Sequence, residues 1–125
     1  MMPSLLVVED DRTTQELIKL TLHNRDFEIE TAETGEEALD VVTAQPPDLI
    51  LLDLMMPGIS GEDLLEHLMQ NPHTRHIPIV ILTAYTSGSL NERDYWLERG
   101  AVDFIVKPFI PADLISRINA AIAQD

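Results

Sequence analysis

The chain of 125 residues contains no cysteine, only two lysines (Lys19 and Lys107), and few aromatic side chains, which make up 5% of the total. The absence of cysteine excludes disulfides, thiolate metal sites and cysteine nucleophiles. No apolar run approaches the roughly 18 residues that span a bilayer, and no basic stretch precedes the short apolar run at the N-terminus. We therefore expect neither a membrane span nor a secretory signal, and we expect a cytoplasmic protein.

Positive charge is also scarce. Asp and Glu outnumber Lys and Arg by 22 to 8, which gives a formal net charge of −14. Binding to nucleic acid depends on neutralising phosphates, and binding to anionic membranes depends on basic residues, so we expect neither partner. The length fits one domain over residues 1–125, and 45% hydrophobic with 24% charged residues is an ordinary balance for a globular protein.

Short apolar runs alternate with amphipathic stretches along the whole chain. Three of the runs are continuously apolar, as in a parallel sheet covered on both faces, whereas Phe27–Thr31 alternates and suits a less buried edge strand. This order predicts an α/β fold: a (βα)5 doubly wound, five-stranded parallel sheet in three layers. The predicted strands are Ser4–Val8, Phe27–Thr31, Asp48–Leu52, Ile77–Leu82 and Val102–Val106.

Start signals for helices lie between the predicted strands. Asp11 is expected to be a favourable charge on the first turn of the first helix. Pro111 suits the first turn of the last helix, whose buried face would carry Leu114, Ile118 and Ile122. Capping-box spacing or a looser form of it occurs at Thr13-x-x-Glu16, Thr34-x-x-Glu37, Ser60-x-x-Asp63 and Ser89-x-x-Glu92.

Polar side chains directly follow four of the five predicted strands, and ligands of open α/β sheets bind at these strand ends. Glu9 and Asp10 follow the first strand, Asp53 the third, Thr83 the fourth and Lys107 the fifth. Converging carboxylates suit a hard cation such as Mg²⁺. Asp53 is then a carboxylate nucleophile that forms an acyl phosphate. The phosphoryl oxygens would be covered by the cation, by the Lys107 ammonium and by the Thr83 hydroxyl.

In these residues the chain resembles the receiver domain of two-component response regulators, over essentially its whole length. No single segment is decisive, but their order and spacing on one fold make the signal specific. The matching segments are Leu6-Val7-Val8-Glu9-Asp10-Asp11, Leu51-Leu52-Asp53-Leu54-Met55-Met56-Pro57-Gly58, Gly61, Leu82-Thr83-Ala84, Gly100-Ala101 and Val106-Lys107-Pro108-Phe109.

The resemblance implies a flavodoxin-like sheet of strand order 2-1-3-4-5 and a cis peptide bond before Pro108. It assigns the phosphoacceptor role to Asp53. It makes Thr83 and Phe104 the switch pair, in which Thr83 turns toward the new phosphoryl group and the Phe104 ring rotates into the vacated space. Mg²⁺ would be bound by Glu9, Asp10, Asp53 and the backbone carbonyl of Met55.

The same resemblance implies the partners. A sensor histidine kinase or a histidine phosphotransfer protein would donate the phosphoryl group. A downstream protein or an attached output domain would read the surface of the fourth helix, the fifth strand and the fifth helix. Asp103, Asp113 and Arg117 resemble charges that pair across receiver homodimers of DNA-binding regulators. The chain would not be an enzyme in the usual sense, since it would catalyse only its own phosphorylation and dephosphorylation.

Several alternatives remain open. One alternative is a Mg²⁺-dependent phosphohydrolase of the haloacid-dehalogenase type. Such enzymes have a second aspartate two residues after the nucleophile as general acid/base. This chain has Met55 there, which cannot move protons, so this position disfavours the alternative. A receiver used only for docking is a second alternative, and both a stand-alone regulator and a receiver cut from a longer one fit the sequence. Trp96 reads as packing or as a partly exposed helix surface, and docking of a partner there is a further alternative. His73 and His76 read as a solvated loop rather than a metal site.

Overall fold

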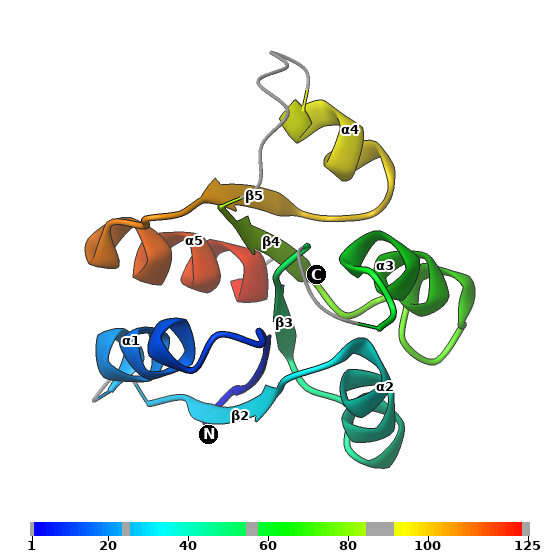
Figure 1. The fold of residues 1–125 in the computed structure, drawn as a ribbon, viewed down its shortest axis with the longest axis horizontal. Helices are drawn as coiled ribbons and strands as arrows, with labels where there is room; N and C mark the ends of the chain where they lie inside the picture. Colours follow the sequence, from blue (N-terminus) through cyan, green and yellow to red (C-terminus); the bar gives the residue numbers. More distant parts are fainter. Residues whose placement is uncertain (1, 24–25, 55–57, 85–91, 124–125) are drawn as a thin grey trace.

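The computed structural model of the chain describes residues 2–23, 26–54, 58–84 and 92–123. Strands and helices alternate along these residues, and neighbouring strands pair in parallel in the order β2-β1-β3-β4-β5, as expected (Figure 1). The strands are β1 (Ser4–Val8), β2 (Glu28–Ala32), β3 (Leu49–Leu52), β4 (Ile79–Thr83) and β5 (Asp103–Val106). The helices are α1 (Arg12–Leu22), α2 (Gly35–Ala44), α3 (Gly61–Gln70), α4 (Glu92–Glu98) and α5 (Pro111–Ala123).

The sheet is the middle of three layers. Figure 1 shows α1 and α5 on one side of it and α2, α3 and α4 on the other. Each face has its own core: one cluster joins the sheet to α2, α3 and α4, and the second joins it to α1 and α5. Side chains of a strand alternate between the two faces, so the central strands must be apolar at every position. Every residue of β3 and β4 is buried, which confirms the three-layer prediction.

The edge strand and the helix starts differ from the predictions in detail. β2 alternates between exposed and half-buried residues up to Thr31, ends at the buried Ala32 and lies at the edge of the sheet, as expected. It begins and ends one residue later than predicted. Thr34 and Ser60 cap α2 and α3, since each side-chain oxygen accepts a hydrogen bond from a main-chain N–H of the first turn. Pro111 is the first residue of α5. These caps and this start confirm the predictions.

The capping prediction for α1 was wrong. The cap is Asp11 rather than Thr13, because the Asp11 carboxylate accepts a hydrogen bond of 3.1 Å from the Thr14 N–H. A carboxylate is favoured beside the partial positive charge of a helix N-terminus, as the sequence predicted for Asp11. Asp11 is the cap, however, and so precedes the first turn instead of lying on it. For α4, the predicted cap Ser89 lies outside the described residues.

Trp96 resolves one of the alternatives from the sequence. Its side chain is buried beneath α4, in the core cluster that also contains Phe104. The neighbouring Tyr95 ring meets it edge-on, with ring centroids 4.9 Å apart. Trp96 therefore packs α4 against the sheet and is not part of the exposed surface.

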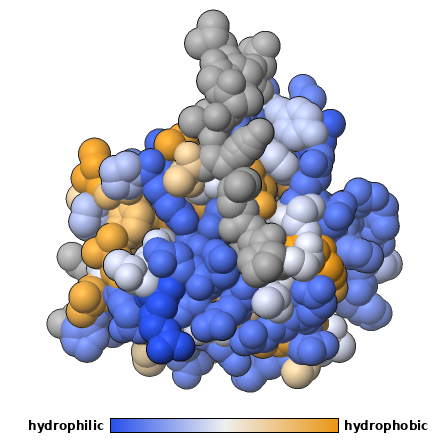
Figure 2. Space-filling view, viewed as in Figure 1, coloured by the Kyte–Doolittle hydropathy of each residue, from blue (hydrophilic) through white to orange (hydrophobic). Residues whose placement is uncertain are grey.

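The outer surface is mainly hydrophilic in the view of Figure 2, with apolar side chains gathered along the margin where Figure 1 draws α1 and α5. Leu17 and Leu20 on α1 are among the exposed large apolar residues, together with Ile110 before α5. Among the described helices, none has the length and apolar character needed to cross a membrane.

Candidate functional site

The predicted site residues converge at the carboxyl ends of the strands. Glu9 directly follows β1, Asp53 directly follows β3, and Lys107 directly follows β5. Thr83 is the last residue of β4 rather than the first residue after it. Glu9, Asp53 and Thr83 are all buried, and Asp10 is exposed. The strand ends therefore bring these five side chains to one edge of the sheet, as the sequence predicted.

Three carboxylates form a compact group there. Glu9, Asp10 and Asp53 each offer one oxygen, and these oxygens lie within 4.8 Å of one another. Two buried carboxylates and one exposed carboxylate repel each other unless a cation neutralises them, and oxygen donors at this spacing are the ligands that Mg²⁺ prefers. The donor set thus fits Mg²⁺. The fourth predicted ligand, the carbonyl of Met55, lies outside the described residues.

Main-chain contacts fix the two buried carboxylates. The Glu9 N–H donates to the Ala32 carbonyl on β2 at 2.9 Å, and the Asp53 N–H donates to the Val8 carbonyl on β1 at 3.0 Å. Gly61 begins α3 so close to Asp53 that a Cβ there would lie 2.8 Å from the Asp53 carbonyl oxygen. Only glycine permits this approach, which packs α3 against the segment that carries Asp53.

Lys107 already joins the two buried carboxylates. Its ammonium hydrogen-bonds to the Glu9 carboxylate and lies 3.4 Å from the Asp53 carboxylate. Burial alone would lower the pKa of Lys107, but the hydrogen bond to Glu9 and the charges of Asp53 and Glu9 outweigh it, so the pKa is raised. Lys107 therefore remains a cation beside Asp53, as expected for a lysine among carboxylates.

The Glu9 carboxyl shows how tightly the acidic group is packed. Burial and the hydrogen bond with Asp53 raise its pKa to about 7, although Lys107 acts in the opposite direction. A carboxylate in this environment favours a second neutralising charge, either a proton or a metal ion. A proton or a metal ion would add to the neutralisation that Lys107 already gives Glu9.

Thr83 and Phe104 lie on one face of the sheet. In the register of β4 and β5, Ile81 is opposite Phe104 and Thr83 is opposite Val106. Ile81 and Phe104 belong to the same core cluster, and Thr83 is two residues further along β4, so its side chain points to that face too. The two residues predicted as a switch pair are thus diagonal neighbours, with Thr83 fully buried and Phe104 9% exposed.

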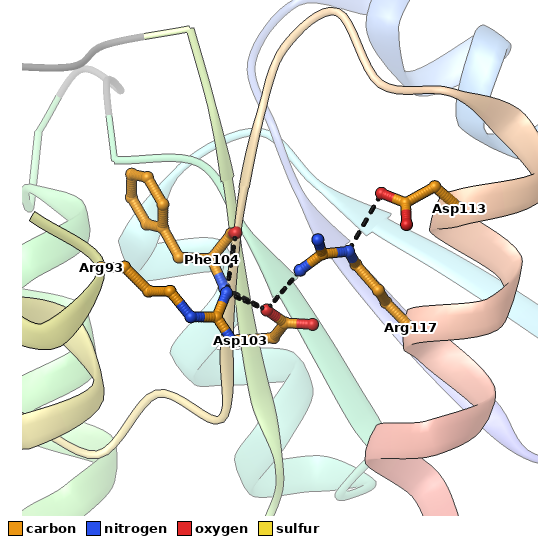
Figure 3. Close-up of polar contacts among 5 residues, drawn as sticks. All are labelled: Arg93, Asp103, Phe104, Asp113 and Arg117. Carbon is orange, nitrogen blue, oxygen red and sulfur yellow. Dashed lines mark hydrogen bonds and ion pairs between the residues drawn. The ribbon is translucent and has the colours of Figure 1, made fainter.

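A group of charged residues joins the elements around Phe104 (Figure 3). Asp103 on β5 accepts hydrogen bonds of 2.6 Å from Arg93 on α4 and 2.7 Å from Arg117 on α5. Arg117 also donates to Asp113 at 3.0 Å. The three charges that resemble dimer contacts are therefore paired with one another inside one chain, and pairing across a dimer stays a prediction.

Sequence reasoning missed two polar residues: Arg93, which contacts Asp103 beside Phe104, and Gln15, which contacts Glu9 in the acidic group. Arg93 was missed because no motif or period links it to Asp103, ten residues away. Gln15 lies on the buried face of α1 with Ile18 and Leu22, and its amide donates to the main-chain carbonyl of Glu9. The spacing of Gln15 and Ile18 on an apolar stripe was a usable signal. His73 and His76, by contrast, are exposed in the turns before β4, in agreement with the solvated-loop reading.

The comparisons with known sequences agree with this geometry. Residues 5–119 match the family described as the response regulator receiver domain. The chain is 39% identical over 124 residues to the phosphate regulon transcriptional regulatory protein PhoB of Rhizobium meliloti (strain 1021), covering 99% of this chain and 54% of that protein. It is 41% identical over 120 residues to PhoB of Escherichia coli (strain K12), covering 96% and 52%. The chain thus spans about half the length of these curated relatives.

Solved structures share the fold. A crystal structure of a putative response regulator from Chloroflexus aurantiacus J-10-fl superposes with a TM-score of 0.91 at 35% identity, covering 99% of this chain and all of that one. The family match covers nearly the whole chain. The strand order is the one that the resemblance implied, and the acidic cluster lies at the carboxyl ends of the strands, as predicted. The chain therefore belongs to the response regulator receiver domain family.

Proposed function

We propose that the chain accepts a phosphoryl group on Asp53 from a phosphohistidine of a sensor histidine kinase or a histidine phosphotransfer protein. The P–N bond of the phosphohistidine breaks, its electron pair returns to the imidazole, and an Asp53 carboxylate oxygen forms the new P–O bond. The observation that carries the proposal is the position of Lys107, whose ammonium contacts both Glu9 and Asp53. A cation beside the nucleophile is what a phosphoryl group with three charged oxygens requires.

The other residues have separate roles in this proposal. Glu9, Asp10 and Asp53 would hold Mg²⁺, together with the Met55 carbonyl that the resemblance assigns. The metal ion supplies charge neutralisation at one phosphoryl oxygen. Lys107 moves from its contact with the carboxylates to a second oxygen, and the buried Thr83 hydroxyl donates to the third. The chain acts on itself only, and the product is a signalling state.

The switch that follows involves Thr83 and Phe104. Thr83 turns its hydroxyl toward the phosphoryl group, and the Phe104 ring moves into the space that Thr83 leaves on the same face of the sheet. A charge added at Asp53 is thereby converted into a change of packing under α4 and β5. Thr83→Ala should still accept phosphate, more slowly because one contact to the phosphoryl oxygens is lost, and should fail to change the packing around Trp96. Equal changes of Trp96 fluorescence in both proteins would show that the hydroxyl is not the trigger.

The output is proposed to pass through the surface of α4, β5 and α5 to a downstream protein, an attached output domain or a second receiver. The two PhoB relatives are named as transcriptional regulatory proteins and are about twice as long as the matched region. Control of transcription is therefore one candidate output, and it would require an attached or separate DNA-binding partner. Direct binding of this domain to nucleic acid is not proposed, given the net charge of −14.

The test is the intact mass of the protein after incubation with acetyl phosphate and Mg²⁺. Wild type should gain one phosphoryl group, whereas Asp53→Asn and a sample with EDTA should gain none. Asp63→Asn is a matched control, since it makes the same change on the exposed first turn of α3. No gain by folded wild type, with a second receiver as positive control and after exposure to phosphorylated histidine phosphotransfer proteins, would favour the docking module over the phosphoacceptor.

A further inference from the structure

The buried face of α1 carries one polar side chain. Gln15, Ile18 and Leu22 are the buried residues of this helix, and Gln15 is only 5% exposed. Packing alone would favour a third aliphatic residue at this position. A buried amide costs stability unless its polar atoms find partners, so the contacts of the Gln15 side chain carry information about its role.

The Gln15 amide fixes the main chain of Glu9. Its Nε2 donates a hydrogen bond to the Glu9 carbonyl oxygen. The Glu9 N–H donates to the Ala32 carbonyl on the opposite side, at 2.9 Å. Both main-chain polar groups of Glu9 are therefore held, one by β2 and one by α1. The peptide that joins Glu9 to Asp10 is fixed by the same hydrogen bond.

The first turn of α1 holds the other end of this loop. The Gln15 main-chain N–H donates to the Asp11 carbonyl at 3.0 Å, which is the first helical hydrogen bond of α1 and does not depend on the Gln15 side chain. The Asp11 N–H in turn donates to the Glu9 carboxylate at 3.3 Å, and the Asp11 carboxylate caps α1 through Thr14. The Gln15 side chain thus binds the first carbonyl of the three-residue segment Glu9–Asp11, and the main chain of α1 binds the last. Asp10 lies between these two anchors.

We propose that Gln15 is a positioning residue, which holds Glu9 and Asp10 in the arrangement that receives Mg²⁺. The inference rests on the proposed function, because it assigns a role in loading the same site. Groups that orient metal ligands raise affinity by removing the cost of ordering them when the ion binds. A purely structural Gln15 would instead contribute to folding and leave the metal affinity of the folded protein unchanged.

The first test is a Mg²⁺ titration of the full chain by isothermal calorimetry. Gln15→Met keeps the length of the side chain and removes the donor, and it should weaken Mg²⁺ binding about 10-fold. Ile18→Val is the matched control, since it loosens the same buried face of α1 without touching Glu9. Wild-type affinity in Gln15→Met, or equal weakening in both variants, would overturn the positioning role. Gln15→Leu replaces Gln15→Met if the latter does not fold by circular dichroism.

The second test separates metal loading from chemistry. The rate of phosphorylation by acetyl phosphate is measured over a range of Mg²⁺ concentrations. In Gln15→Met the half-saturating Mg²⁺ concentration should rise about 10-fold, while the rate at saturating Mg²⁺ returns to the wild-type value. A lower rate at saturation with an unchanged half-saturating concentration would overturn the inference alone. Failure of wild type to bind Mg²⁺ would instead overturn the proposed function on which the inference rests.

Discussion

The hydroxyl of Tyr95 on α4 donates a 2.7 Å hydrogen bond to the carboxylate of Glu62 in the first turn of α3. Arg99 stacks over the Tyr95 ring at 3.4 Å and lies 3.8 Å from the same carboxylate. The hydrogen bond to Glu62 raises the pKa of the Tyr95 hydroxyl above its usual value, which is itself well above neutral pH. α4 is thus tied to the helix whose first residue, Gly61, packs against the segment that carries Asp53.

Breaking this contact should cost little stability, because the residues are largely exposed. Tyr95→Phe keeps the ring and removes the donor, and we expect it to lower the free energy of unfolding only slightly. Glu62→Gln should have a similar effect. The measurement is urea denaturation followed by Trp96 fluorescence. If the two effects simply add in the double variant, the hydroxyl and the carboxylate do not interact in solution.

Asp103 should matter more than Asp113 for stability. The Asp103 side chain is 14% exposed and accepts from both Arg93 and Arg117, whereas that of Asp113 is 45% exposed and pairs with Arg117 alone (Figure 3). Asp103→Asn leaves two guanidinium groups facing each other and should lower the free energy of unfolding by about 2 kcal/mol. Asp113→Asn is the matched control and should cost about 0.5 kcal/mol. Equal losses in chemical denaturation would contradict this ranking.

The Asp11 cap should make α1 sensitive to acid. The hydrogen bonds from the Thr14 side chain and then from its main-chain N–H hold the pKa of Asp11 below its usual value. A carboxyl whose pKa is lower in the folded state contributes stability that is complete above the unfolded value of about 3.9 and disappears as the pH falls through the folded value. Asp11→Asn caps without a charge, so its stability deficit should shrink over that acidic range.

The check on Asp11 is the urea midpoint of wild type and Asp11→Asn over a series of acidic pH values. Asp40→Asn makes the same chemical change on the exposed face of α2. A difference between wild type and Asp11→Asn that stays constant with pH would show that the charge of the cap contributes nothing.

Mg²⁺ should stabilise the folded protein. A ligand that binds the folded state adds about 2.7 kcal/mol at a free concentration of 100 times its dissociation constant, so the melting temperature should rise with Mg²⁺ and fall again with EDTA. Asp10→Ala removes an exposed member of the acidic cluster and should reduce this gain. Asp40→Ala changes the net charge equally but lies on α2, and it should keep the full gain. Identical gains in the two variants would place the ion elsewhere.

The fold class and the position of the central site could be predicted because both follow from the order and composition of the strands. The continuous apolar runs can only be buried between two helical layers, and parallel strands bring their carboxyl ends to one edge. That logic placed Glu9, Asp53 and Lys107 directly after their strands, and Thr83 is one residue earlier than predicted, at the end of β4. Phe104 lies on the same face of the sheet as Thr83. Confirmation of their roles is a separate matter, and the roles stay proposals.

The errors concern a choice between two neighbouring caps and contacts between residues that are distant in the sequence. Thr13-x-x-Glu16 carries a capping-box pattern, but Asp11 captured the helix start because a carboxylate binds the free N–H groups more strongly. Arg93, Asp103 and the Tyr95–Glu62 contact are long-range pairings of surface side chains, which no short motif specifies. The position of Gln15 on an apolar stripe was a usable signal, but its partner was not, because a main-chain carbonyl is present at every sequence position.

The most direct test of the central claim is to locate the phosphoryl group. The protein is phosphorylated with acetyl phosphate and Mg²⁺, reduced with borohydride, which converts an aspartyl phosphate to homoserine, and mapped by peptide mass spectrometry. The proposal predicts homoserine at position 53 and unmodified carboxylates at Glu9 and Asp10. Modification at any other carboxylate, with Asp53 intact, would contradict the assignment of Asp53 as the phosphoacceptor.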